Sequence, residues 1–210
     1  MTTATVGSVR RAVRAVRERV RSAAVEYPAH GWGVLPGSVW DGERYTLGHT
    51  ASPADGLRPV ILSGRTLRTA REVWSWWSVA PYAVLARVGE DFDVLTAPAD
   101  LVSAALRSPD SAAGACPVML SPDRTSAMLL LRPGSRLRWE LRTVPGVILL
   151  PVGALVALPP TVTGEGEWSW WVDPFDGYRP GLPGAVQKAL SAAAAALRAS
   201  GTATGRGGRR

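Results

Sequence analysis

The stretch AVLARVGEDFDVLTAP, residues 83–98, decides the fold. Two short apolar runs, 83–87 and 92–95, flank a turn that contains glycine and acidic residues. Such runs between turn residues predict buried strands, either a β-hairpin or two adjacent central strands. Because proline is tolerated in a first helical turn, Pro98 predicts that a helix follows at once. Strands that run into helices at an acidic turn are places where α/β enzymes hold metal-binding carboxylates.

Length and composition indicate one globular domain. The chain has 210 residues, 46% of them apolar and 20% charged, which are ordinary values for such a protein. We predict an α+β fold with α/β character, in which helices flank a mixed central β-sheet. Residues 1–8 are predicted to be a flexible N-terminus, residues 9–199 the folded domain and residues 200–210 a disordered basic tail.

The net charge of +7 resides in the two ends of the chain. Residues 10–21 contain six arginines and one glutamate, and residues 198–210 contain four arginines and no acid. The intervening part holds 14 basic and 16 acidic residues, so it is nearly neutral. This distribution does not indicate a duplex-gripping channel through the middle of the domain.

A single cysteine, Cys116, excludes an intrachain disulfide and a cysteine-based zinc site. This fits a reduced, cytoplasmic protein. The arginine-rich N-terminus is not followed by the apolar core of a signal peptide. The longest apolar run, residues 144–158, is interrupted by prolines and glycines and is too short to span a bilayer, so no membrane association is expected.

The first predicted helix runs from an N-cap at Ser8 to about Tyr27. It carries two stripes at helical spacing, one apolar and one basic. The apolar stripe consists of Val9, Val13, Val16, Val20 and Ala24, and the basic stripe of Arg10, Arg14, Arg17 and Arg21. The basic stripe has two interpretations, a solvated flank of a packed helix or a set of phosphate contacts.

A second helix is predicted from a capping box at Thr69 and Glu72 through Trp77. Its predicted apolar face is Ala70, Val73, Trp74 and Trp77. Three tryptophans in four positions allow base stacking, but tryptophan at helical spacing beside apolar residues is more typical of a core.

The remaining elements follow from apolar runs and turn residues. The predicted strands are residues 31–36, 39–47 with a turn at Asp41-Gly42, 57–62, 116–120, 127–131, 147–150, 155–158 and 168–172. Helices are predicted over residues 99–107 and 183–199. Residues 137–142 alternate apolar and charged side chains, which favours a strand and leaves a short helix as the alternative.

Four segments in this order resemble one family. They are GWGVLP (31–36), VWSWWSVAPYAVLARVG (73–89), FDVL (92–95) and LVALPPTVTGEGEWSWWVDP (155–174). Together they resemble the bifunctional primase–polymerase N-terminal domain of the archaeo-eukaryotic primase superfamily, and more closely its short stand-alone actinobacterial members. The resemblance covers roughly residues 9–198 as an order of weak motifs.

The resemblance implies a divergent RRM-like catalytic sheet, two-metal nucleotidyl transfer and DNA as a partner. Active members carry an Asp-x-Asp pair at the end of the central strand, a Ser-x-His on a following strand and a third acid. Thr96 and Pro98 stand where the two aspartates are expected, and neither can supply the carboxylate oxygens that bind Mg²⁺ or Mn²⁺. The strand over 126–132 has no histidine. The resemblance therefore supports the fold and argues against the activity, so no catalytic residue, metal site or cofactor is assigned.

One alternative registration would restore the metal pair. Asp91 and Asp93 are two residues apart, so on a strand they would share a face and could bind Mg²⁺ or Mn²⁺. An active DNA primase or polymerase, which is the third functional hypothesis, requires this pair and a further acid.

The first hypothesis is a catalytically degenerate primase–polymerase-like protein that binds nucleic acid or a nucleotide in a regulatory or accessory role. Its candidate residues are the four arginines of the basic stripe and, by resemblance alone, Arg132, Thr161 and Trp170. The second hypothesis is a protein-interaction module on the same fold, without nucleic-acid binding. Exposed tryptophans, such as Trp76 or Trp171, would suit that role.

Overall fold

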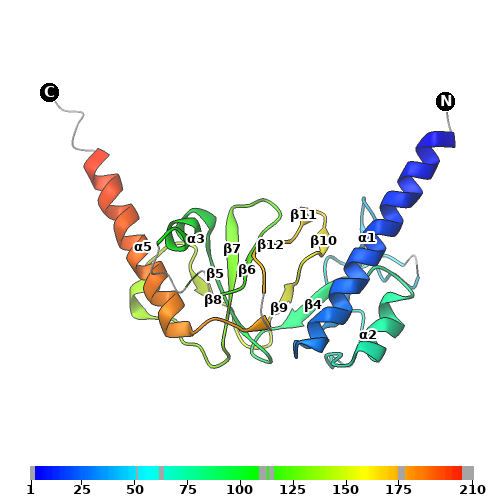
Figure 1. Cartoon of the computed structure of the whole chain (residues 1–210), viewed down its shortest axis with the longest axis horizontal. Helices are drawn as coiled ribbons and strands as arrows, with labels where there is room; N and C mark the ends of the chain where they lie inside the picture. Colours follow the sequence, from blue (N-terminus) through cyan, green and yellow to red (C-terminus); the bar gives the residue numbers. More distant parts are fainter. Residues whose placement is uncertain are drawn as a thin grey trace. The chain divides into compact units, whose positions relative to one another are not determined.

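The computed structural model describes residues 3–50, 52–61, 64–108, 113, 116–174 and 178–204, with side-chain placement within 14–200. The chain forms two compact units (Figure 1). Unit 1 is Met1–Arg87 with Leu155–Ser169, and unit 2 is Val88–Ala154 with Trp170–Arg210. Helices and several sheets occur together, which confirms the predicted α+β class. Among the described residues, no helix combines the length and the apolar character needed to cross a bilayer.

Unit 1 is built on a three-stranded antiparallel sheet. Its central strand β4 (Ala83–Arg87) lies between β1 (Leu35–Gly37) and β9 (Leu155–Ala157). Leu35, Leu85 and Ala157 are in register across the three strands and form one buried cluster. The predicted strand over 57–62 is absent, because Pro59 forms only an isolated bridge with Gly37 and Leu62 lies outside the described residues.

Two small hairpins complete the β-structure of unit 1. One joins β2 (Val39–Trp40) to β3 (Tyr45–Thr46), and the other joins β10 (Val162–Thr163) to β11 (Gly166–Glu167). The predicted turn at Asp41-Gly42 is confirmed, and the Asp41 carboxylate accepts the amides of the next turn residues. A Cβ at Gly164 would stand 3.2 Å from the Trp40 ring, so a larger residue there would require the ring to shift slightly.

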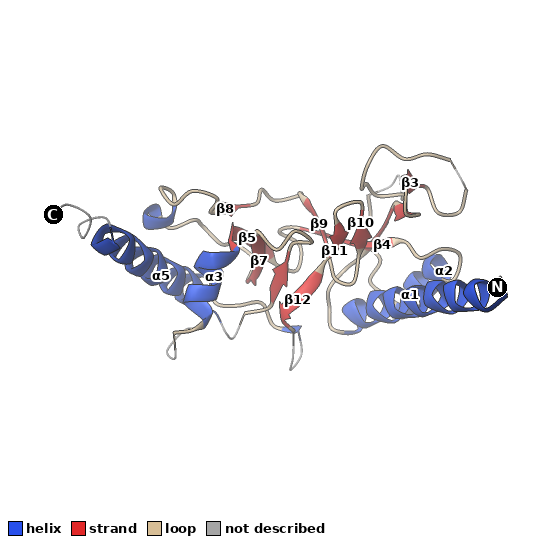
Figure 2. Cartoon of the chain, turned by 90° about the horizontal axis from the view of Figure 1, so that it is seen from above, coloured by secondary structure: helices blue, strands red, loops and turns tan. Residues whose placement is uncertain are grey.

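Helices α1 (Thr3–Ala29) and α2 (Ala70–Trp77) pack against each other in unit 1 (Figure 2). The prediction of an N-cap at Ser8 is wrong, because the helix begins at Thr3 and Ser8 lies within it. The apolar stripe is confirmed in its second half, where Val20 and Ala24 are buried. Tyr27 is also buried, and its hydroxyl donates to the carbonyl of Pro159.

The predicted capping box of α2 is confirmed. The Thr69 hydroxyl accepts the Glu72 amide at 3.3 Å, and the Glu72 carboxylate accepts the Thr69 amide at 3.2 Å. Arg65 donates to the same carboxylate at 2.6 Å. The hydrogen bond from Arg65, followed by that from Thr69, lowers the pKa of Glu72 from 4.5 to about 2.

This pKa predicts a specific acid sensitivity. Because the folded pKa of Glu72 lies below its ordinary value, its contribution to stability is present above pH 4.5 and is lost as the pH falls toward about 2. The melting temperature of Glu72→Gln should therefore fall less than that of the unmodified protein between pH 4.5 and about 2. Glu43→Gln, which removes an exposed carboxylate with no ion pair in the described structure, should leave it unchanged. Equal effects of both variants would contradict the assignment.

A five-stranded sheet with the order β12-β6-β7-β5-β8 organises unit 2. The strands are β5 (Asp93–Pro98), β6 (Val118–Leu120), β7 (Ser126–Leu131), β8 (Ile148–Leu149) and β12 (Ser169–Val172). The antiparallel ladder of β5 and β7 runs from Asp93 opposite Leu131 to Pro98 opposite Ser126. Helix α3 (Ala99–Leu106) follows Pro98 directly, as predicted, and packs beside α5 (Pro183–Thr204). The predictions of a flexible N-terminus and a disordered tail are wrong for residues 3–8 and 200–204, which belong to α1 and α5. Residues 1–2 and 205–210 lie outside the described residues.

The two apolar runs of residues 83–98 do not pair with each other. β4 pairs with β1 and β9, whereas β5 pairs with β7 and β8, so the predicted hairpin or pair of adjacent strands is wrong. Both edges of each strand are already occupied by partners from distant parts of the chain. The turn between the runs is closed by Gly89, which has a φ of +89° and donates its amide to the Phe92 carbonyl at 2.8 Å.

Candidate functional site

In the stretch 83–98, Asp93 has a structural role. Asp93, the first residue of β5, is buried, and its Oδ2 accepts the Ser135 amide at 2.6 Å. Asp91 precedes the strand, so the two aspartates do not share a strand face as the alternative registration requires. Within the described part of the chain, no three His, Cys, Asp or Glu side chains form a group that could hold a metal ion.

Ser135 belongs to a loop that we call the arginine loop, residues 132–142, with the sequence RPGSRLRWELR. It follows β7 and contains the short 3-10 helix η2 (Trp139–Leu141). Its exposed cationic side chains are Arg132, Arg136, Arg138 and Arg142, against one acid, Glu140. The predicted strand over 137–142 is therefore wrong, and the short-helix alternative is confirmed.

Buried polar side chains hold the arginine loop from inside. In addition to Asp93, Gln187 of α5 is 1% exposed and spans two loop residues. Its Oε1 accepts the Arg138 amide at 2.8 Å, and its Nε2 donates to the Arg136 carbonyl at 3.0 Å. Leu141 is fully buried and fixes the end of the loop. Because the backbone groups are satisfied inside the protein, the loop is ordered and its arginines remain on the surface.

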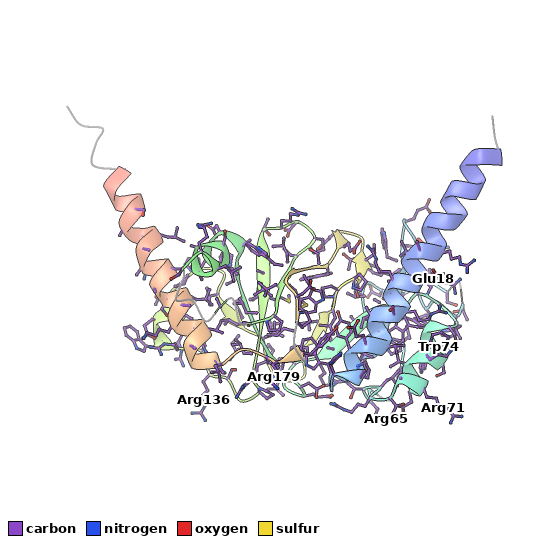
Figure 3. The ribbon with its side chains drawn as sticks, in the orientation of Figure 1. Glu18, Arg65, Arg71, Trp74, Arg136 and Arg179 are labelled. Carbon is purple, nitrogen blue, oxygen red and sulfur yellow. The ribbon has the colours of Figure 1, made fainter. Side chains whose placement is uncertain are left out.

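The segment before α5 lies beside the start of this loop. Arg132 donates its amide to the Gly181 carbonyl at 2.9 Å, and Gly181 donates to the Leu130 carbonyl at 2.8 Å. Arg179 is therefore two residues from a direct backbone contact with the loop, and its side chain is exposed. Figure 3 shows Arg136 and Arg179 at the same edge of unit 2.

Most of the positive charge of the arginine loop is uncompensated. Arg138 pairs with Glu140 at 2.7 Å, and their hydrogen bond raises the pKa of Arg138 and lowers that of Glu140. Within the described residues, no carboxylate forms an ion pair with Arg132, Arg136 or Arg142. Trp139, in the middle of the loop, is 75% exposed. Exposed guanidinium groups can bind phosphate, and an open indole on the same loop can stack on a planar ring.

The predicted basic stripe of α1 has a different environment. Arg14 pairs with Glu18 at 2.9 Å, and Arg17 donates to the Val79 carbonyl at 3.1 Å. The Arg21 guanidinium lies over the Trp74 ring, 4.4 Å from its centroid. The side chain of Arg10 lies outside the described residues. Each described arginine of the stripe therefore has an intramolecular partner.

The three residues carried over by resemblance have different environments. Thr161 is fully buried in unit 1, where its hydroxyl bonds to the amide and the carbonyl of Val84 at 2.9 and 3.2 Å. This side chain is not available to a ligand, because both its hydrogen-bonding roles are used inside the fold. Trp170 is half-buried in β12 of unit 2. Arg132 is the one member of the three that lies in the arginine loop.

The tryptophans of α2 divide between core and surface. Trp77 is buried and donates its indole N–H to the Tyr82 carbonyl at 2.8 Å. Trp76 is half-buried and packs edge-on against Tyr82. Trp74 is 53% exposed, so its predicted place on the apolar face with Val73 and Trp77 is wrong. Elsewhere in the chain, Trp171 is 38% exposed.

Sequence reasoning did not single out Arg136, Arg142, Trp139 or Gln187. The signal was present, because four arginines occur within eleven residues around one tryptophan and one acid. It was interpreted as strand alternation. The role of Gln187 had no local signal, since its partners are about fifty residues earlier in the chain.

Comparison of the chain with family models, with curated proteins and with solved structures found no match. The primase–polymerase relationship therefore stays a prediction from the motif order.

Proposed function

We propose that this protein is a non-catalytic, primase–polymerase-like protein that binds nucleic acid through the arginine loop. The observation that carries the proposal is the anchoring of the loop by Asp93 and Gln187, with arginines left exposed and without carboxylate partners. Nucleic acids are polyanions, and arginine binds their phosphates with paired, charge-assisted hydrogen bonds. An accessory or regulatory role and a cytoplasmic location belong to the same proposal.

The order of the loop contributes to binding. Arginine side chains on a mobile segment lose conformational freedom when they bind, whereas a loop whose backbone is already fixed loses less. Phosphate contacts position a nucleic acid without reading its sequence. Trp139 adds a flat, open surface on which an unpaired base can stack. We therefore expect binding that depends strongly on salt and weakly on sequence.

The non-catalytic part of the proposal rests on residue chemistry. Thr96 and Pro98 of β5 carry no carboxylate, and they stand where the resemblance places the metal-binding pair. The nearby Asp93 carboxylate is buried, and its Oδ2 accepts the Ser135 amide. Nucleotidyl transfer by two metal ions requires carboxylates that are free to coordinate them.

The test compares two triple variants of equal charge. Arg132→Ala, Arg136→Ala and Arg142→Ala together remove the uncompensated loop cations. Arg44→Ala, Arg58→Ala and Arg107→Ala remove three exposed arginines elsewhere. With a fluorescein-labelled single-stranded 20-mer, the loop variant should bind on the order of a hundredfold more weakly at low salt. Its log–log salt slope should be shallower by about 2, because each lost phosphate contact on a single strand contributes about 0.7.

The control triple should bind the 20-mer only slightly more weakly than the unmodified protein, because it lowers the net charge by the same amount without touching the arginine loop. Equal losses in the two triples would show that the arginine loop has no special role. Absence of binding by the unmodified protein at about 50 mM salt would contradict the proposal itself.

A further inference from the structure

A second surface of unusual composition lies on unit 1, between α1 and α2. Two of the large apolar side chains that the described structure leaves open are Trp74 at 53% and Val79 at 56% exposure. They belong to one surface, because Arg17 of α1 bonds to the Val79 carbonyl and Arg21, one turn later, covers the Trp74 ring. Figure 3 shows Trp74 on α2, next to α1. We call these four residues the α1–α2 surface.

The two arginines of this surface are held in place but not neutralised. Arg17 is bonded to a neutral carbonyl oxygen, and Arg21 is stacked on a neutral indole ring. The nearest described acid on α1, Glu18, is bonded to Arg14 at 2.9 Å. Arg14, and to a smaller extent Arg21, lowers the pKa of Glu18. This carboxylate therefore remains charged and is engaged mainly by Arg14.

The α2 side of the surface is also positive. Arg71, which is labelled in Figure 3, is exposed one turn before Trp74. Among the described residues, no carboxylate forms an ion pair with it. The acid that follows it, Glu72, accepts hydrogen bonds from Arg65 and from the amide of the N-cap residue Thr69. The surface therefore combines an exposed aromatic and aliphatic centre with cations that lack a counter-ion.

We infer that the α1–α2 surface binds an acidic segment of a partner protein that also carries large apolar side chains. Tryptophan and arginine are the residue types that contribute most at protein interfaces. Carboxylates of the partner would pair with Arg17, Arg21 and Arg71, and its apolar side chains would cover Trp74 and Val79. The phosphates of a nucleic acid would pair with the arginines, but a nucleic-acid backbone offers no apolar group to cover the exposed Val79. The charge and the apolar area together favour a protein.

The test uses a phage-displayed library of random 16-residue peptides selected on the full chain. We expect the selected peptides to combine acidic residues with leucine, phenylalanine or tryptophan. Trp74→Ala should weaken their binding about thirty-fold, and Arg17→Glu with Arg21→Glu at least as much. The matched controls, Trp139→Ala for an exposed tryptophan and Arg44→Glu with Arg58→Glu for charge reversal, should change binding less than threefold.

Three outcomes would overturn the inference. They are selected peptides without acidic residues, peptides whose binding does not depend on Trp74, and full competition by the single-stranded 20-mer. The last outcome would assign the surface to nucleic acid. Failure of the nucleic-acid proposal would not affect this experiment, because the loop triple variant should bind the selected peptides normally.

Discussion

Gln187→Leu should lower the free energy of unfolding by about 1–3 kcal/mol, although it replaces a buried residue by one of similar size. Leucine would leave the Arg138 amide and the Arg136 carbonyl without the partners that Gln187 provides at 2.8 and 3.0 Å. A typical intramolecular hydrogen bond contributes about 0.5–1.5 kcal/mol net, and two are lost here. Urea unfolding followed by tryptophan fluorescence measures the change.

The same variant should weaken nucleic-acid binding without removing a single arginine. Because Gln187 holds the backbone at Arg136 and at Arg138, its loss should release the middle of the loop and restore the entropic cost of ordering it. Hydrogen exchange of the Arg138 amide should accelerate more than that of amides in β7. Lys188→Leu, at the neighbouring exposed position of α5, is the control and should leave the exchange of Arg138 unchanged. Unaltered stability in Gln187→Leu would contradict the anchoring role.

Asp93 is the second position at which a large effect is expected, and its two replacements should differ. Asp93→Ala removes the acceptor of the Ser135 amide, a hydrogen bond of 2.6 Å to a buried carboxylate, and should cost about 2–3 kcal/mol. Asp93→Asn keeps a side-chain oxygen in the same place and should retain most of the stability and the binding. Thermal unfolding and the 20-mer binding assay measure both effects. Asp55→Ala, at an exposed aspartate, is the control.

This pair of variants also separates the anchor from the metal-site alternative. If Asp91 and Asp93 bound Mn²⁺, a neutral side-chain amide would be a poor replacement for the second carboxylate. Asp93→Asn would then be as damaging as Asp93→Ala in the presence of the ion. A thermal stabilisation by Mn²⁺ that is lost in Asp93→Asn would therefore contradict the anchor and support the metal pair.

The two proposals together describe a protein with two binding surfaces and no catalytic centre. The arginine loop of unit 2 is proposed to bind the phosphates of nucleic acid, and the α1–α2 surface of unit 1 to bind an acidic partner protein. Each proposal has its own variants and its own ligand, so one can fail without the other. Such a pair of surfaces would allow the protein to bring a partner to nucleic acid, which is an accessory role in the sense expected from the sequence.

Local sequence signals were sufficient for several elements. The capping box at Thr69 and Glu72, the turn at Asp41-Gly42 and the helix after Pro98 are all confirmed. Each depends on groups within four residues of one another, so the chemistry that forms it is visible in a short stretch of sequence. The burial of the two apolar runs in residues 83–98 was predictable for the same reason.

Tertiary structure decided what those elements contact. The edges of β4 and β5 can accept any strand, and only the complete fold selects partners from distant parts of the chain. The same is true of Asp93, Gln187 and Thr161, whose hydrogen bonds join residues 42 to 77 positions apart. A buried carboxylate and a metal ligand look identical in a sequence, since the difference lies in which atom approaches it. For this protein, the sequence determined where helices and strands could form. Packing determined which polar groups form hydrogen bonds within the fold and which remain available to a ligand.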